Sequence, residues 1–126
     1  MRNDTGFEDY LLAYARLEEP PEVAITARST ARVLTIAISG SIDVQACATL
    51  SRRLERLIAD APGRRVVLDL SGVEFCDCAG VRVLLAVHET VTAAGLTCTV
   101  DGVRPHVRWL LHFTGASAVM SLTPPG

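Results

Sequence analysis

The sequence predicts a single α/β domain built on a mixed central sheet of four to five strands, with about three helices mainly on one face. Apolar runs of strand length alternate along the chain with segments whose apolar residues recur at helical spacing. The first two strand segments follow one another directly, which favours an antiparallel hairpin. Later strands are separated by helices, as parallel neighbours require. A length of 126 residues suits one domain with its own core.

The first half of the chain contains two strand segments and one helix. Residues 23–27 and 32–39 are predicted strands, and the second alternates apolar positions with small or polar ones. Gly40 is expected to end this second strand. Asp43 then stands where a carboxylate would accept hydrogen bonds from the free N–H groups of a helix over residues 44–59. The apolar residues of that helix fall on one stripe, which predicts packing against the sheet.

The second half repeats the alternation of strands and helices. The apolar run at 65–70 is typical of a covered central strand, and residues 71–78 are expected to be a connector. A left-handed conformation at Gly95 would end the helix that precedes it. The elements predicted after the connector are a helix at 80–94, a strand at 96–100, a helix at 105–113 and a short strand at 116–122.

Domain boundaries follow from changes in composition. Residues 1–21 are predicted to form an N-terminal arm, either a short docking helix or a loose segment, because apolar residues recur at helical spacing and two prolines follow. Residues 22–123 then form the domain, and residues 124–126 a C-terminal tail. The arm lacks the apolar core of a secretory signal, and no run approaches the roughly 18 apolar residues of a membrane span. A cytoplasmic protein without membrane insertion is expected.

Charge and motif content exclude several function classes. The net charge is −2, and the 12 basic residues, all Arg, are scattered along the chain, which disfavours direct nucleic-acid binding. No Gly-rich phosphate loop, catalytic triad or acid–base pair stands at a convincing position, so we expect no enzyme activity and no cofactor. The spacing of His and Cys fits no metal site, and the cysteines are expected to be thiols. Among them, Cys47 and Cys98 are interpreted as small buried side chains.

The most informative chemistry lies at the start of the second predicted helix, in the sequence Asp77-Cys78-Ala79-Gly80. A helix N-terminus presents free N–H groups and a partial positive charge, which suits a side chain that receives a phosphate. On local chemistry alone, however, Asp77 is a helix cap and Gly80 permits close packing. The residues of this segment leave both interpretations open.

Three segments resemble the STAS domain family, the sulfate transporter and anti-sigma factor antagonist family. The segment VVLDLSGVEFCDCAGVRVLL resembles its signature, an apolar strand ending in Asp-Leu, a connector, and Phe-x-Asp-Ser-Ser/Thr-Gly opening a helix. The turn Gly40-Ser41-Ile42-Asp43 resembles the family's Gly-x-Leu-Asp turn, and residues 103–115 resemble its closing helix. The resemblance covers residues 23–122, most of the chain.

The resemblance implies an anti-sigma factor antagonist, which binds an anti-sigma factor with an ATP-binding kinase fold, releases a sigma factor and so regulates transcription. The implied partner-binding residues are Asp43, Asp77, Cys78, Ala79 and Gly80. In the bacterial antagonists of the family, the partner phosphorylates the Ser after the Asp. Here Cys78 occupies that phosphoacceptor position and Ala79 follows it, so neither hydroxyl is present. We therefore expect docking without serine phosphorylation at the usual site.

Two other functions stay open for the same residues. STAS-like domains also serve as accessory subunits of membrane transport ATPases, and the N-terminal arm would suit docking of that kind. A thiol-based, redox-responsive regulator would instead use Cys78, with Cys76 as the resolving thiol. The first alternative would use the arm and the second the helix start at Cys78, and the sequence leaves the oligomeric state open.

Four further side chains carry structural expectations. Asp69 is expected near a strand end, where its carboxylate accepts backbone hydrogen bonds. His88 is expected on the solvated side of its helix. Trp109 and Phe113 lie four residues apart on the third predicted helix and suit a small exposed aromatic patch, although core packing is the expected role of Phe113.

Overall fold

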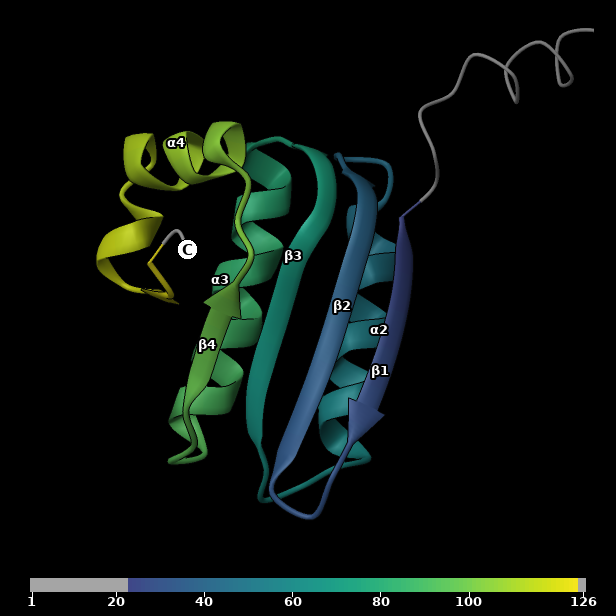
Figure 1. Ribbon diagram of the computed structural model, residues 1–126. Helices are drawn as coiled ribbons and strands as arrows, with labels where there is room; N and C mark the ends of the chain where they lie inside the picture. Colours follow the sequence, from purple (N-terminus) through teal and green to yellow (C-terminus); the bar gives the residue numbers. More distant parts are fainter. Residues whose placement is uncertain (1–22, 125–126) are drawn as a thin grey trace, which may run out of the picture.

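The computed structural model describes residues 23–124, and the predicted N-terminal arm lies outside the described residues. These residues form one five-stranded sheet in the spatial order β1-β2-β3-β4-β5 (Figure 1). The first pair is antiparallel and the other three pairs are parallel, which confirms the predicted mixed sheet. The strands are β1 (Ala24–Ser29), β2 (Val33–Ile42), β3 (Arg65–Cys76), β4 (Cys98–Asp101) and β5 (Ser121–Leu122).

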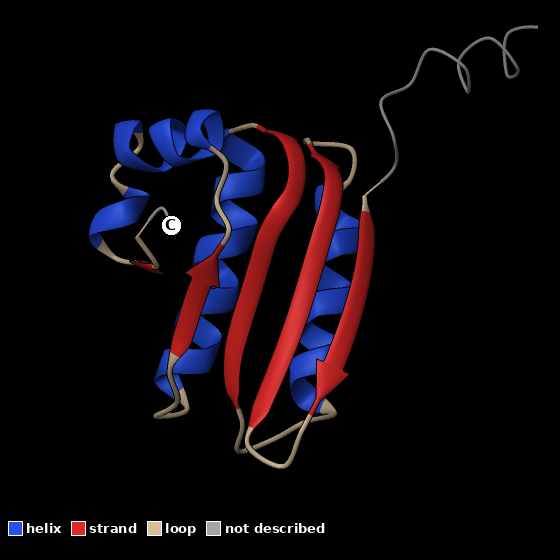
Figure 2. Cartoon of the chain, in the orientation of Figure 1, coloured by secondary structure: helices blue, strands red, loops and turns tan. Residues whose placement is uncertain are grey.

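Two long helices cover one face of the sheet. Helices α2 (Cys47–Ala59) and α3 (Cys78–Ala93) lie behind the strands in the view of Figure 2. Helix α4 (Pro105–Phe113) lies across the end of the sheet where β3 terminates, and the short 3₁₀ helix η1 (Ala116–Ala118) follows it. Within residues 23–124, no helix is long and apolar enough to cross a bilayer.

The core lies between the sheet and these two helices. Leu34, Ile36 and Ile38 alternate along β2 and are at most 2 % exposed, as the sequence pattern predicts. The residues between them are only partly buried, because they face the side of the sheet opposite α2 and α3. Leu50 and Leu54 of α2 are fully buried, which confirms the apolar stripe of that helix.

The central strands are longer than the sequence pattern indicated. Gly40 does not end β2; the strand continues through Ile42, with Gly40 at a left-handed φ of +94°. Residues 71–78 are likewise not a connector, because β3 continues to Cys76. The parallel ladder between the two strands shifts register at two places and then resumes, so paired backbone hydrogen bonds override the local preference of glycine for a turn.

The ends of other elements also differ from the predictions. Helix α2 begins at Cys47, later than the predicted residue 44. Helix α3 begins at Cys78, earlier than the predicted residue 80. The segment 116–122 is mostly η1 and a turn, with a strand of only two residues at its end. The small residues of η1 allow this tight turn, and the Met120 N–H donates to the Ala116 carbonyl oxygen at 2.9 Å. Gly95 does adopt the predicted left-handed conformation, with φ of +81°.

Candidate functional site

Two loops meet at the carboxyl edge of the sheet, the edge where β2 and β3 end (Figure 1). The two strands pair in parallel as far as Ile42 and Cys76, so the residues after them, Asp43 and Asp77, leave the sheet side by side. The Asp77 N–H donates to the Ile42 carbonyl oxygen at 3.2 Å, which extends the contact beyond the last strand pair. The fold thereby brings the two sequence-predicted site segments together.

The Asp77 carboxylate connects the two loops. Asp77 has an extended backbone (φ −107°, ψ −175°) directly before α3, as an N-cap residue does. Its Oδ1 accepts a hydrogen bond from the Gly80 N–H at 3.0 Å, and its Oδ2 accepts one from the Val44 N–H at 3.2 Å. One side chain thus caps α3, as the sequence predicted, and also holds the β2–α2 loop, which the sequence did not indicate.

Asp43 does not cap α2, and that prediction was wrong. The cap position of α2 is Ala46, which makes no side-chain cap hydrogen bond. The Ala46 N–H donates instead to the Asp43 Oδ1 and to the Asp43 carbonyl oxygen, both at 3.0 Å, and the Cys47 Sγ donates to that carbonyl oxygen at 3.1 Å. These bonds close a turn of the kind that aspartate favours, and the helix begins only after it.

Cys78, Ala79 and Gly80 form the first turn of α3. The Cys78 side chain is exposed, Ala79 is partly buried and Gly80 is buried. A Cβ at Gly80 would lie 2.7 Å from the Ile42 Cγ2 and 2.8 Å from both the Ile42 carbonyl oxygen and the Cys76 Sγ. Gly80 therefore lets α3 pack closely against the end of β2, and Cys78 stands at the exposed start of the helix.

Two thiols beside this edge are held in the protonated form. Burial raises the pKa of Cys76 to about 12, and the Asp77 carboxylate is the next largest cause. Burial and the carboxylates of Asp77 and Asp43 also raise the pKa of Cys47. A thiol with so high a pKa supplies almost no thiolate near neutral pH, so Cys76 is poorly suited to resolve an oxidised Cys78.

The thiols differ in burial, and none of them belongs to a metal cluster among the described residues. Cys98 is only 2 % exposed, as predicted, whereas Cys47 is partly exposed because it lies at the start of α2. Within residues 23–124, no group of three or more His, Cys, Asp or Glu side chains is placed to hold a metal ion. At the carboxyl edge, the exposed thiol is that of Cys78.

Two exposed apolar side chains flank the carboxylates, and the sequence pattern did not indicate them. Val44 is 69 % exposed and Phe75 is 49 % exposed. Val44 follows Asp43 directly, and Phe75 lies on the last part of β3, two residues before Asp77. Their only signal in the sequence is an apolar residue next to the turn that leaves each strand. The carboxyl edge is thus both acidic and apolar, a combination that suits a protein partner.

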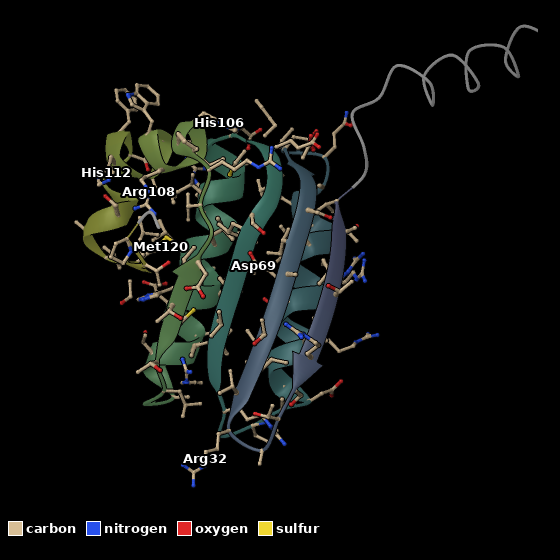
Figure 3. The ribbon with its side chains drawn as sticks, in the orientation of Figure 1. Arg32, Asp69, His106, Arg108, His112 and Met120 are labelled. Atoms are coloured by element: carbon tan, nitrogen blue, oxygen red, sulfur yellow. The ribbon has the colours of Figure 1, made fainter. Side chains whose placement is uncertain are left out.

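Helix α4 begins next to the same edge. The His106 Nε2 lies 2.6 Å from the Glu74 carbonyl oxygen, and the Arg104 Nε donates to the Ser71 carbonyl oxygen at 2.8 Å. These bonds attach the β4–α4 segment to the outer part of β3, where β4 no longer pairs with it. Figure 3 shows His106 at this end of the molecule and Asp69 further along the sheet, on the face opposite α2 and α3.

Asp69 and His88 both differ from the predictions, although one part of the expectation for Asp69 is confirmed. The Asp69 Oδ1 accepts a hydrogen bond from the Ser71 N–H at 3.0 Å, but Asp69 lies within β3 and not near its end. His88 is only 8 % exposed and lies on the buried side of α3. The buried face of α3 is wider than a single apolar stripe. His88 lies at the edge of this face and is therefore buried with it.

The aromatic pair on α4 is exposed, so the expectation of core packing for Phe113 was wrong. Trp109 is 62 % exposed and Phe113 is 74 % exposed. Their rings stack with centroids 5.0 Å apart and an interplanar angle of 10°. The buried side of α4 is formed instead by Val107 and Leu111, because the helix lies across the end of the sheet and needs only a narrow apolar face.

Comparison with known proteins places the chain among STAS domains. Residues 25–123 match the family model described as Mlab, STAS domain. Over 75 residues the chain is 31 % identical to the anti-sigma-F factor antagonist RsfB of Mycobacterium tuberculosis, an alignment that covers 60 % of this chain and 61 % of the relative. The matched segment thus spans about three-fifths of that curated relative.

Two solved structures show how widely this fold is used. An anti-sigma factor antagonist from Mycobacterium paratuberculosis is 27 % identical, with a TM-score of 0.73 over 82 % of this chain and 87 % of that one. The murine anion transporter solute carrier 26 family member A9 is 13 % identical, with a TM-score of 0.69 over 94 % of this chain and 23 % of that one. The second likeness concerns the fold alone.

Proposed function

The chain belongs to the STAS domain family, and from this membership and the carboxyl edge of its sheet we propose that it is an anti-sigma factor antagonist. It binds an anti-sigma factor of the ATP-binding kinase type in the cytoplasm, releases a sigma factor and thereby regulates transcription. The observation that carries the proposal is the exposed Cys78 at the start of α3, beside a carboxylate that joins both edge loops. The similarity to two anti-sigma factor antagonists, from Mycobacterium tuberculosis and Mycobacterium paratuberculosis, supports it.

The proposed docking surface consists of Asp43, Asp77, Cys78, Ala79 and Gly80. Gly80 acts through packing, since it is buried and sets the distance between α3 and β2. The two carboxylates give the surface a negative charge, and both already accept backbone hydrogen bonds from the edge loops. In the proposed mechanism the protein acts by contact with its partner and not by catalysis.

Phosphorylation is absent from the proposed mechanism. A phosphate at the first residue of α3 would add about −1.5 to −2 charges beside Asp77 and would weaken docking by repulsion. Cys78 carries a thiol there, which is not the normal substrate of a serine kinase, and Ala79 offers no hydroxyl in its place. The antagonist therefore binds its partner constitutively, or its binding is regulated by means other than phosphorylation of this residue.

Binding to an ATP-binding anti-sigma factor from the same host tests the docking surface. A Cys78→Glu variant should bind at least about tenfold more weakly, because a longer, charged side chain beside Asp77 adds repulsion between like charges and must lose its hydration at the contact. Ala86→Glu is the matched control, since Ala86 is exposed on the same helix but lies two turns further from the edge. Equal affinity of both variants, with their folds intact by circular dichroism, would rule out this surface.

Incubation with ATP and the same partner, followed by mass spectrometry, tests the loss of phosphorylation. The wild-type chain should gain no phosphate at Cys78, whereas Cys78→Ser should gain one. Ala79→Ser is the control, because it places a hydroxyl one residue further along the helix. A phosphate on wild-type Cys78 would contradict the proposal.

Recovery of partners from the native host separates the proposal from the transport alternative. Capture of a histidine-kinase-like ATP-binding protein supports an antagonist. Capture of the ATPase of a membrane transporter would instead assign the domain to a transport machine, a role compatible with the occurrence of this fold within an anion transporter.

A further inference from the structure

The edge strand β1 and helix α2 lie on the opposite side of the molecule from α4 (Figure 1). Side chains of these two elements line a groove between them. Its volume is about 190 Å³, and its lining residues are Ile25, Ala27, Arg53, Arg56, Leu57 and Asp60. Ile25 and Leu57 form the apolar floor of the groove. The Ile25 side chain is only 9 % exposed, and Leu57 is partly buried. Two exposed arginines stand on the rim, so the groove suits a segment that is both apolar and acidic.

The first 22 residues of this chain have that composition. They carry six acidic and two basic side chains, which leaves eight acidic and ten basic side chains for the rest of the chain. The segment is therefore acidic and the domain that follows it is basic. Within the segment, apolar residues recur at helical spacing: Phe7, Tyr10, Leu11, Tyr14 and Leu17.

We propose that residues 7–17 dock into the β1–α2 groove of their own chain. Aromatic and leucine side chains cover the floor at Ile25 and Leu57, and the neighbouring carboxylates pair with Arg53 and Arg56. The single acidic lining residue, Asp60, lies at the C-terminal end of α2. This inference goes beyond the proposed function, because the groove shares no residue with the surface proposed for the anti-sigma factor.

The length of the chain allows this contact. The segment joins the described structure at Val23, directly before β1, and Ile25 of the groove is two residues further along. The six steps from Leu17 to Val23 span up to about 20 Å when extended, at roughly 3.3–3.6 Å per residue. So short a tether gives the docked segment a high effective concentration at the groove.

The two tyrosines of the chain, Tyr10 and Tyr14, allow a direct test in the full-length protein. Both lie in the proposed docking segment, so fluorine NMR of the protein labelled with 3-fluorotyrosine reports on that segment alone. In the wild-type protein, we expect two resonances shifted from their positions in urea. Arg53→Glu should move both resonances to the urea positions, because it replaces a paired cation with a repelling charge.

Arg52→Glu provides the matched control. Arg52 is exposed on the same helix and undergoes the same charge change, but it does not line the groove. Its two resonances should keep the wild-type positions, and circular dichroism should show that both variants are folded. Equal responses to Arg52→Glu and Arg53→Glu would overturn the proposal, because general electrostatics would then explain the shift.

Two other outcomes would also overturn it. Wild-type resonances at the urea positions would show that the segment does not dock. Resonances that reach the shifted positions only as protein concentration rises would assign the groove to the segment of a second copy. Neither result would affect the binding assays at Cys78, so failure of this inference and failure of the proposed function are distinguishable.

Discussion

In both the β2–α2 and the β3–α3 connection, an aspartate follows the last residue of a central parallel strand. Asp43 keeps its hydrogen bonds within its own turn, whereas Asp77 bonds its own helix and, through its second oxygen, the Val44 N–H of the other connection. The difference arises after the aspartate. Gly80 brings α3 close to Ile42, and this close approach places the Asp77 carboxylate within reach of the neighbouring loop. Equivalent residues at equivalent strand ends can thus have different structural roles.

Replacement of Asp77 should have the largest effect on stability. Asp77→Ala removes a helix cap and a bond between loops, and we expect it to lower the free energy of unfolding by about 2–3 kcal/mol. Urea unfolding measures this loss. Hydrogen exchange at the Val44 amide should accelerate more than the stability change explains, because that N–H loses its acceptor. Unchanged exchange at Val44 would show that the bond between the loops is not formed in solution.

Addition of one methyl group at Gly80 tests whether close packing creates the difference between the two aspartates. Gly80→Ala places a Cβ against the backbone and side chain of Ile42, and we expect a loss of about 1–2 kcal/mol after the gain in helix propensity. The shift of α3 should also weaken the Asp77–Val44 bond, which faster exchange at Val44 would report. A stabilised variant with unchanged exchange would refute this explanation.

Replacement of Asp43 should cost less than either change. Asp43→Ala removes one bond within a partly exposed turn, so we expect a loss of about 0.5–1 kcal/mol in urea unfolding. It also serves as the matched control for Asp77→Ala, since both remove a carboxylate from the same edge. If the two variants were equally destabilised, the contrast between the connections would have no energetic basis.

The smallest effect concerns the thiols. The charge of Asp77 raises the pKa of both Cys47 and Cys76, whereas Asp43 is a cause only for Cys47. Asp77→Asn removes a negative charge, lowers both pKa values and should speed alkylation of both thiols between pH 8 and 10 by less than about threefold, because burial is the larger cause. Asp43→Asn should speed alkylation at Cys47 alone. Mass spectrometry of iodoacetamide-treated protein resolves the sites.

Local pattern was sufficient for most of the fold. The alternation of Leu34, Ile36 and Ile38 in β2 and the apolar stripe of α2 predicted the sheet, its helix-covered face and the core, because each pattern is set by the period of a single element. The cap at Asp77 and the exposed helix start at Cys78 were predictable for the same reason. These features depend on residues that lie within a few positions of one another.

Tertiary structure decided the features in which distant segments compete for the same backbone groups. β2 continues past Gly40 because β3 supplies hydrogen-bond partners there, and the second bond of Asp77 exists only because the fold places Val44 beside it. His88 is buried, and Phe113 exposed, by the way their helices are packed. The sequence determines which local contacts a residue favours. The packing of the elements determines which hydrogen-bond partners and neighbouring side chains lie close enough to contact it.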